Sequence, residues 1–406
     1  MHLPPVAKQP RHSHLHKPIP YGRQNISPAD VQAVVDVLRS DWLTQGPAIG
    51  RFEQAVAAYC GVGHAVATCN ATAALHLACL ALEVGPGDWL WTSPNTFVAS
   101  ANCGLYCGAR VDFVDIDPKT YNISVPALAS KLEHAKREGK LPKVVVPVDF
   151  SGQSCEMRAI AELASQYGFR VIEDASHAVG GDYLGSKVGN GRYADVTIFS
   201  FHPVKIITTG EGGLVLTNDP ELHDRIAMLR SHGITRNPEL MEWESEGPWY
   251  YQQVALGFNY RVTDLQAALG LSQLARVDEF VRRRRQLAAR YARLLSDLPV
   301  VTPWQHPDTC SAWHLYVIQL ASECGCSRRE VVEKLRVANV LVNVHYIPVH
   351  LQPYYRHMGF QPGMYPIAEK YYGAAISLPM YYDLTDEEQD YVVDQLRCAV
   401  ASLVSR

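Results

Sequence analysis

Short apolar runs and segments of helical periodicity alternate along the first two thirds of the chain. The run at residues 143–148 is almost continuously β-branched, which is typical of a strand buried between two layers of helices. Similar runs predict strands at residues 65–69, 89–93, 111–114, 170–173, 196–199 and 213–216. Helical periodicity fills the intervals, as at residues 125–137 and 157–167. The alternation predicts an α/β fold, with a mostly parallel sheet and helices on both of its faces.

The pattern is different near the start of the chain. Ser27-Pro28 begins a predicted helix. Its apolar face would consist of Val31, Val34, Val35 and Leu38. Another helix is predicted at residues 51–60, before the first strand of the sheet. Residues 1–20 lack such periodicity and predict a flexible tail.

The pattern changes again in the last third of the chain. A long helical pattern covers residues 263–298, and Pro299 follows it. The next predicted elements are a strand at 315–320 and helices at 328–339 and 386–404. We therefore predict a large domain at residues 21–277 and a smaller C-terminal α+β domain at residues 278–406.

Composition and charge exclude several classes of protein. The 406 residues carry a formal net charge of -4, so the chain has no basic excess for nucleic acid or an anionic membrane surface. The arginines at 282–285 point around a helix and predict a solvated or interfacial segment. No apolar run is long enough to span a bilayer. We expect no nucleic-acid and no membrane partner.

The cysteines indicate the compartment. The ten cysteines include no CxxC pair and no zinc-site spacing, which predicts buried thiols, a reducing setting and no metal. The first twenty residues lack the apolar core of a secretory signal. Together these features predict a cytoplasmic protein.

One lysine follows a predicted strand and precedes a glycine-rich turn. Pro203 prevents a helix before Lys205, and the sequence TTGEGG follows at residues 208–213. A partly desolvated amine at such a strand end loses its proton more readily and can form a Schiff base with an aldehyde. The alternative is an ordinary exposed loop lysine.

Two further strand ends carry candidate chemistry. The strand at 65–69 runs into a helix beginning near Asn70, and free N–H groups at a helix start suit a phosphate. The strand at 170–173 delivers Asp174 to the sheet edge where doubly wound folds bind ligands. A carboxylate there can keep the nitrogen of a pyridine ring protonated. Asn70, Thr72 or Asp174 could each instead be a simple helix cap.

Five motifs together resemble a known family. They are NATAAL at Asn70, PNTF at Pro94, EDASHAVGG at Glu173, FSFHPVKIITTGEGG at Phe199 and GFNYRVTDLQAALG at Gly257. In this order they are similar to the sugar-nucleotide aminotransferases of the DegT/DnrJ/EryC1/StrS group, and the likeness covers nearly all of residues 21–406. The segment VNVHYIPVHLQPYY at Val342 resembles the branch that acts on UDP-linked sugars in pseudaminic acid biosynthesis. The fold implied is the aspartate aminotransferase-like fold type I.

The resemblance implies a pyridoxal 5'-phosphate site. Lys205 would hold the cofactor as a Schiff base and move the proton during catalysis, and Asp174 would pair with the ring nitrogen. Phe97 would stack on the ring. The phosphate would be held by the backbone amides of Thr72 and Ala73, by the Ser200 hydroxyl, and by Asn259 from the neighbouring subunit of a homodimer.

Other positions are implied less directly. His177 stands near the cofactor's 3'-oxygen, where many relatives carry glutamine. His345 and Tyr346 are candidates for substrate contact, and His314 and Tyr316 for the architecture of the substrate site. For these last four residues, ordinary packing is an equal alternative. Some family members carry histidine in place of the lysine and dehydrate the sugar, and Lys205 disfavours that branch.

The resulting functional hypothesis is a transaminase. It would move an amino group from L-glutamate to the 4-keto group of a UDP-linked 4-keto-6-deoxy-N-acetylhexosamine. One alternative is another 3- or 4-keto nucleotide sugar, such as a dTDP-linked one. The other is a non-catalytic regulatory protein that binds the cofactor or a sugar nucleotide.

Overall fold

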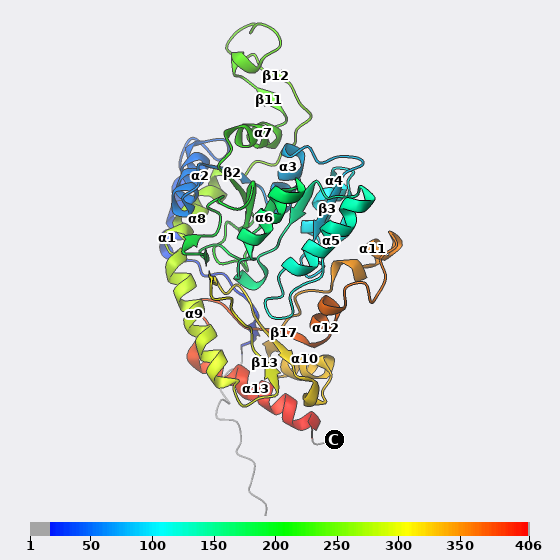
Figure 1. The fold of residues 1–406 in the computed structure, drawn as a ribbon. Helices are drawn as coiled ribbons and strands as arrows, with labels where there is room; N and C mark the ends of the chain where they lie inside the picture. Colours follow the sequence, from blue (N-terminus) through cyan, green and yellow to red (C-terminus); the bar gives the residue numbers. More distant parts are fainter. Residues whose placement is uncertain (1–16, 405–406) are drawn as a thin grey trace, which may run out of the picture.

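A seven-stranded sheet lies at the centre of the computed structural model, which describes residues 17–404 (Figure 1). Its strands, in spatial order, are β2 (His64–Thr68), β10 (Gly213–Thr217), β9 (Val196–Ser200), β6 (Arg170–Asp174), β5 (Val144–Val146), β3 (Trp89–Thr92) and β4 (Arg110–Phe113). Only β10 runs antiparallel to its neighbours. The predicted mostly parallel α/β fold is therefore confirmed.

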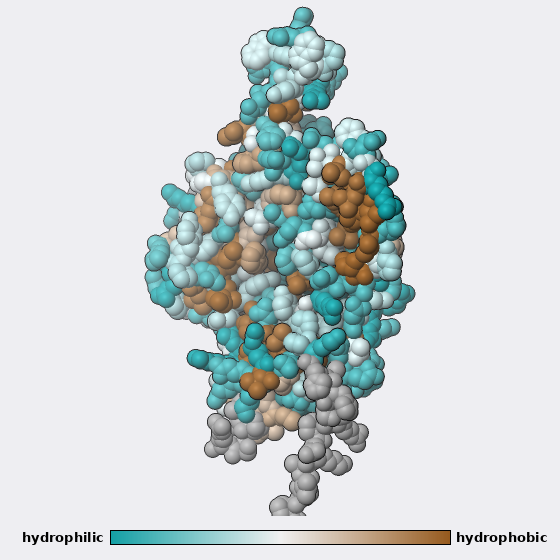
Figure 2. Space-filling view, turned by 180° about the vertical axis from the view of Figure 1, so that it is seen from behind, coloured by the Kyte–Doolittle hydropathy of each residue, from teal (hydrophilic) through white to brown (hydrophobic). Residues whose placement is uncertain are grey.

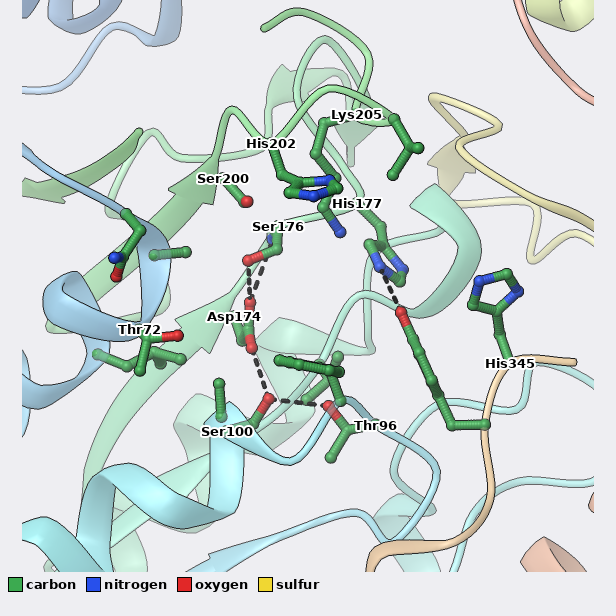
Figure 3. A pocket seen from close by; sticks show the side chains of 18 of the residues that line it. Thr72, Thr96, Ser100, Asp174, Ser176, His177, Ser200, His202, Lys205 and His345 are labelled. Carbon is green, nitrogen blue, oxygen red and sulfur yellow. Dashed lines mark hydrogen bonds between the residues drawn. The ribbon is translucent and has the colours of Figure 1, made fainter. Parts of the chain in front are cut away.

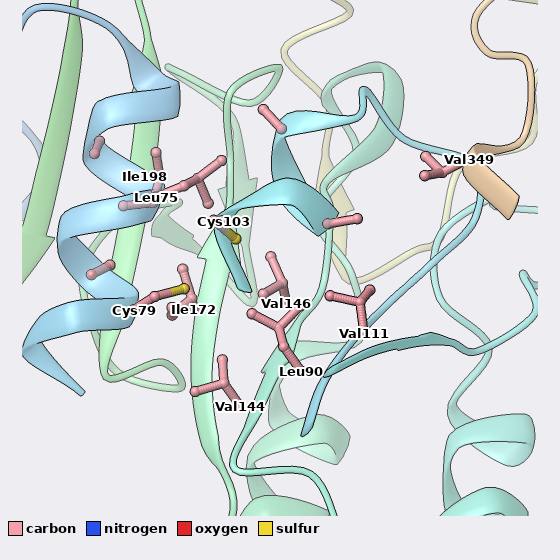
Figure 4. Close-up of a cluster of buried hydrophobic side chains, with 14 of the residues drawn as sticks. Leu75, Cys79, Leu90, Cys103, Val111, Val144, Val146, Ile172, Ile198 and Val349 are labelled. Atoms are coloured by element: carbon pink, nitrogen blue, oxygen red, sulfur yellow. The ribbon is translucent and has the colours of Figure 1, made fainter. Parts of the chain in front are cut away.

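Helices cover both faces of this sheet because its strands bury side chains on both. On β5, Val144 and Val146 belong to one buried cluster with α3 (Ala71–Ala81) and α4 (Ala99–Tyr106), shown in Figure 4. Val145 faces the other way and packs with α5 (Val125–Glu138) and α6 (Met157–Tyr167). Burying each such side chain contributes about 1.5–3 kcal/mol, so the continuous apolar runs hold the sheet between its helical layers.

The C-terminal part has its own core. A small sheet combines β13 (Val300–Val301), β15 (Tyr316–Leu320) and β17 (Ala375–Leu378). Around it pack α10 (Arg328–Val337), α13 (Asp386–Val404) and the end of α9 (Val277–Leu294). The start of α9 packs in the large core and its end in the small one, so this helix joins the two cores. The division at residue 278 stays a prediction.

Arg284 ties the two parts together from within α9. Its side chain is fully buried, and Nη1 donates to three backbone carbonyls. These belong to Trp313, His314 and Met380, at 3.2, 3.2 and 2.9 Å. The interfacial interpretation of the arginine run therefore applies to Arg284.

The remaining elements are short or lie around these cores. The helices are α1 (Pro28–Leu38), α2 (Pro47–Cys60), α7 (Pro220–Arg230), α8 (Asp264–Leu274), α11 (Pro353–His357) and α12 (Pro366–Ala374). The short strands are β1 (Ile19–Pro20), β7 (Asp182–Tyr183), β8 (Ser186–Lys187), β11 (Ile234–Thr235), β12 (Gln252–Gln253), β14 (Thr309–Cys310) and β16 (Val340–Leu341). Single 3-10 turns occur at Phe150–Gly152, Pro238–Leu240, Ser322–Cys324 and Val349–Leu351.

A hairpin formed around β11 and β12 projects from one end of the molecule (Figures 1 and 2). Trp243 and Trp249 lie between these two strands and are 68% and 71% exposed. Large indole side chains rarely remain in water over most of their surface. The hairpin thus presents two large indole side chains to solvent.

Some local predictions differ from the structure. The helical pattern at 263–298 forms two helices, α8 and α9, with a break at Ala275 and Arg276. No glycine or proline marks this break. Instead, the Arg276 side chain is held by Asn25 Oδ1 at 2.8 Å and lies over the Phe280 ring. Tertiary contacts thus interrupt a pattern that is continuous in sequence.

The apolar face predicted for α1 is wrong in part, because only Val34 and Val35 of its four residues are half-buried. Val31 and Leu38 are exposed, whereas Asp30 is completely buried. Its carboxylate accepts hydrogen bonds from Ser272 Oγ at 2.6 Å and Gln273 Nε2 at 2.7 Å. These polar contacts with α8, together with the burial of Val37, set the rotation of α1.

The N-terminal tail was predicted to extend to residue 20. Ile19–Pro20 forms β1, which pairs in parallel with β16, and Ile19 is buried in the small core. Residues 1–16 lie outside the described part of the chain. The start of the described chain thus belongs to the C-terminal core.

Candidate active site

A cavity of about 530 Å³ lies at the carboxyl edge of β6 and β9. The start of α3, the start of α4 and the segment after β16 close its other sides (Figure 3). The residues that line it and that are used below are Tyr21, Asn70, Thr72, Thr96, Phe97, Ser100, Asp174, Ser176, His177, Ser200, Lys205, His345 and Tyr346. Segments far apart in sequence meet here because parallel strands bring their carboxyl ends to one edge.

Asp174 is the last residue of β6 and is held on both carboxylate oxygens. It is 5% exposed. Oδ2 accepts a hydrogen bond from Ser100 Oγ at 2.6 Å, and Oδ1 accepts from Ser176 Oγ at 2.6 Å. Ser100 in turn lies 2.8 Å from Thr96 Oγ1, and Figure 3 shows this chain of contacts. The carboxylate is thus fixed in direction while still facing the cavity.

Lys205 lies in the loop after β9 and reaches the same cavity. Burial lowers the pKa of its amine to about 8, and the attraction of Asp174 offsets part of that effect. Such an amine is substantially unprotonated at mildly alkaline pH. This environment differs from that of an exposed loop lysine, the alternative interpretation of the sequence.

Gly213, in the glycine-rich segment after Lys205, allows two backbone segments to approach closely. A Cβ at Gly213 would lie 2.4 Å from the carbonyl carbon of Asn70. Only glycine therefore allows β10 to begin directly against the start of α3. The segment that approaches this turn so closely is the backbone of Asn70.

The start of α3 offers an anion site, but only one of the two expected backbone amides, that of Thr72, is free to serve it. Asn70 caps the helix, and its Oδ1 accepts a hydrogen bond from the N–H of Ala73 at 2.8 Å. Ala73 is buried and does not line the cavity. Thr72 and Ser200 do line it, and within the described chain no acceptor contacts the Thr72 N–H. A phosphate would thus find the Thr72 amide, the Ser200 hydroxyl and the positive end of a helix.

Aromatic and imidazole side chains form the opposite part of the cavity. Phe97 is 59% exposed, and its ring centroid lies 6.3 Å from that of Tyr346. The Tyr346 hydroxyl lies 3.2 Å from His177 Nε2. His345 Nδ1 lies 2.8 Å from Ser377 Oγ, and burial lowers the pKa of His345 to about 3. Burial also lowers the pKa of His177 well below its ordinary value, so both imidazoles are neutral at physiological pH.

Three of the predicted site residues lie elsewhere. His314 does not line the cavity and packs behind His177, with ring centroids 4.3 Å apart. Tyr316 is buried in the small core between Tyr291 and Trp313. Asn259 is exposed at the base of the hairpin and bridges to Ser231, outside the cavity of its own chain. We therefore treat His314 and Tyr316 as packing residues behind the site.

Sequence reasoning missed Ser100, Ser176 and Thr96. Ser176 follows Asp174 by two residues, and this spacing is typical of a local Asx turn that could have been predicted. Ser100 lies 74 residues from Asp174 in the chain. No local pattern connects those two positions.

No group of histidine, cysteine and acidic side chains within residues 17–404 has an arrangement suited to a metal ion. In the same part of the chain, none of the helices combines the length and the apolar composition needed to cross a membrane.

Comparison with known proteins gives the same picture over almost the whole chain. Residues 24–397 match the DegT/DnrJ/EryC1/StrS aminotransferase family. The chain is 41% identical over 383 residues to the spore coat polysaccharide biosynthesis protein SpsC of Bacillus subtilis, covering 93% of this chain and 96% of that protein. It is 38% identical over 379 residues to UDP-4-amino-4,6-dideoxy-N-acetyl-beta-L-altrosamine transaminase of Campylobacter jejuni, covering 93% and 96%.

A solved structure agrees with these sequence comparisons. PseC of Helicobacter pylori, an aminotransferase involved in the biosynthesis of pseudoaminic acid, superimposes with a TM-score of 0.86 at 32% identity. The match covers 95% of this chain and 100% of PseC. The chain belongs to the DegT/DnrJ/EryC1/StrS family of pyridoxal-phosphate-dependent sugar aminotransferases.

Proposed function

We propose that this enzyme moves an amino group from L-glutamate to the 4-keto group of a UDP-linked 4-keto-6-deoxy-N-acetylhexosamine, in pseudaminic acid or a related surface-sugar pathway. The observation that carries the proposal is the placement of Lys205 and Asp174 on one cavity, with an anion site at the start of α3. The C. jejuni and H. pylori relatives support the choice of sugar.

The cavity fits pyridoxal 5'-phosphate by the chemistry of its lining. Lys205 would hold the cofactor's aldehyde, the Thr72 amide and Ser200 hydroxyl its phosphate, and Asp174 its ring nitrogen. Phe97 offers an aromatic face for the ring, worth about 0.5–1.5 kcal/mol beyond the buried area. When bound, the cofactor supplies an electron-withdrawing ring that stabilises negative charge on the reacting carbon.

Lys205 is also the group placed to move protons. With a pKa of about 8, its amine can take up and release a proton near neutral pH. The fixed carboxylate of Asp174 would keep a ring nitrogen protonated throughout, because Ser100 and Ser176 prevent it from turning away. His345 and Tyr346 line the side of the cavity left for the sugar.

The protein would act as a homodimer with shared active sites. Asn259 is exposed outside its own cavity, as a residue that serves the neighbouring subunit must be. The exposed Trp243 and Trp249 support the presence of a protein partner near that hairpin. We also place the reaction in the cytoplasm, where the free state of all ten cysteines would persist.

A panel of keto sugars tests the substrate. UDP- and dTDP-linked 3-keto and 4-keto sugars are incubated with L-glutamate, and product masses are recorded. We expect amination of the UDP-linked 4-keto-6-deoxy-N-acetylhexosamine at a kcat/KM at least about tenfold above every other sugar, equivalent to about 1.4 kcal/mol. Preference for a dTDP-linked or 3-keto sugar would instead support the second transaminase hypothesis.

The regulatory alternative makes a different prediction. A cofactor-loaded transaminase loses its yellow colour when an amino donor converts the cofactor to its amine form. A yellow protein that L-glutamate and other amino donors leave unchanged would favour a regulatory protein.

The pH dependence of cofactor capture tests the environment of Lys205. Only an unprotonated amine attacks an aldehyde, so the capture rate rises with pH and levels off above the pKa of the lysine. We expect cofactor-free protein to capture pyridoxal 5'-phosphate with a midpoint near pH 8, measured by visible absorbance. A midpoint above pH 10, as for an ordinary lysine, would contradict the buried environment.

A further inference from the structure

Both ring nitrogens of His177 are engaged by neighbouring groups. The backbone N–H of Ser151 donates to Nδ1 at 3.2 Å. A backbone N–H can only donate, so Nδ1 carries no proton. Burial lowers the pKa of His177 well below its ordinary value, and the positive charge of Lys205 lowers it further. The ring is therefore neutral, and its single proton is on Nε2.

This assignment fixes the direction of the next hydrogen bond. His177 Nε2 lies 3.2 Å from the Tyr346 hydroxyl, so the imidazole donates and the phenol oxygen accepts. The hydroxyl proton of Tyr346 must then point to another acceptor. Burial raises the pKa of Tyr346 above its ordinary value, so the phenol keeps this proton.

The surroundings of Tyr346 leave the cavity as the direction of that proton. Tyr346 lines the cavity with Lys205 and His345. Phe97 and Phe150 contact its ring at centroid distances of 6.3 and 6.1 Å and provide no acceptor. The contact between Tyr346 and His177 lies at the cavity wall, because both side chains line the cavity.

We propose that Tyr346 donates a hydrogen bond to an unprotonated oxygen of the bound ligand, and that His177 is the positioning residue that sets its direction. This inference rests on the proposed function. Two ligand oxygens have the required chemistry: the ring oxygen of the cofactor and the keto oxygen of the sugar. His177 itself, with Nε2 engaged by Tyr346, acts on the ligand through the phenol.

The tautomer is tested first, in cofactor-free protein. Long-range proton–nitrogen correlation spectra of ¹⁵N-histidine-labelled protein report which nitrogen carries the proton, and His177→Gln identifies the signal. We expect the neutral Nε2–H tautomer between about pH 6 and pH 8. An ordinary histidine, with a pKa of about 6.5, changes its charge in this range. A proton on Nδ1, or a charged ring in that range, would overturn the proposal whatever reaction the enzyme catalyses.

Tyr346→Phe then tests the donated bond and distinguishes the two oxygens. If the acceptor is the cofactor oxygen, the pH titration of the visible band in loaded protein shifts upward by about one to two units, because the unprotonated oxygen loses a charge-assisted bond. If the acceptor is the keto oxygen, the titration is unchanged. In that case kcat/KM for the keto sugar falls about 10- to 100-fold, and the rate with the amino donor is retained.

Matched variants complete the test. Tyr354→Phe removes the hydroxyl of an exposed tyrosine outside the cavity. It should change neither the pH titration of the visible band nor kcat/KM for the keto sugar. His177→Leu should reproduce part of the effect of Tyr346→Phe. His177→Gln should show the titration and the kcat/KM of the unaltered enzyme, because an amide can accept from Ser151 and donate to Tyr346. A Tyr346→Phe enzyme with an unchanged titration and an unchanged kcat/KM would refute the proposal.

Discussion

Lys205→Ala is expected to abolish transamination, with a loss of at least about 10⁴-fold in kcat. The variant loses both the amine that captures the cofactor's aldehyde and the group that moves the proton, and proton transfer alone contributes about 10²–10⁴-fold. The partly deprotonated amine beside Asp174 supports this double role. Product formation by mass spectrometry and the visible absorbance of the loaded protein measure the two losses separately.

Two variants show whether the effect is chemical. Lys205→Arg keeps a positive charge but cannot form the covalent bond, so it should be as inactive as Lys205→Ala. Lys140→Ala removes an exposed lysine that pairs with Glu138, and it should retain full activity. All three should melt at temperatures close to that of the unaltered protein. Full activity in Lys205→Ala would end the catalytic assignment.

The central sheet could be predicted because its strands bury both faces. A run such as Val144, Val145 and Val146 distributes its side chains between two cores, and that requirement is visible in the sequence itself. The orientation of α1 could not be predicted in this way. Its burial depends on Asp30, whose partners Ser272 and Gln273 lie more than 240 residues away.

The same distinction applies to the site. Asp174 ends β6 and Lys205 lies in the loop after β9, so a sheet-edge argument brings them together. Ser100 reaches the site through the packing of α4 against α3, β3 and β4, which places its hydroxyl on Asp174. The N–H of Ala73 bonds to the capping side chain of Asn70 and not to a ligand. The sequence is compatible with either partner.

Asp174→Asn is expected to lower kcat by about 10²–10³-fold, a loss of the size found when one preorganised electrostatic contact is removed from a reacting charge. An amide cannot keep a ring nitrogen protonated, so the cofactor becomes a poorer electron sink. The colour of the loaded protein should persist because Lys205 is intact. Single-turnover rates with L-glutamate measure the effect on the first half-reaction directly.

Glu173→Gln provides the matched control for this variant. Glu173 is the preceding residue of the same strand, is equally buried, and accepts a hydrogen bond from Thr197 Oγ1 at 2.7 Å outside the cavity. Burial raises the pKa of Glu173 and so favours its neutral form, which makes a neutral amide a mild change there. We expect the kcat of Glu173→Gln to stay within a few-fold of that of the unaltered enzyme. Both substitutions replace an acid by its amide at adjacent positions of one strand. Equal rates in both would therefore show that Asp174 is only a structural cap, whereas a slow Asp174→Asn beside a normal Glu173→Gln identifies the carboxylate that faces the ring.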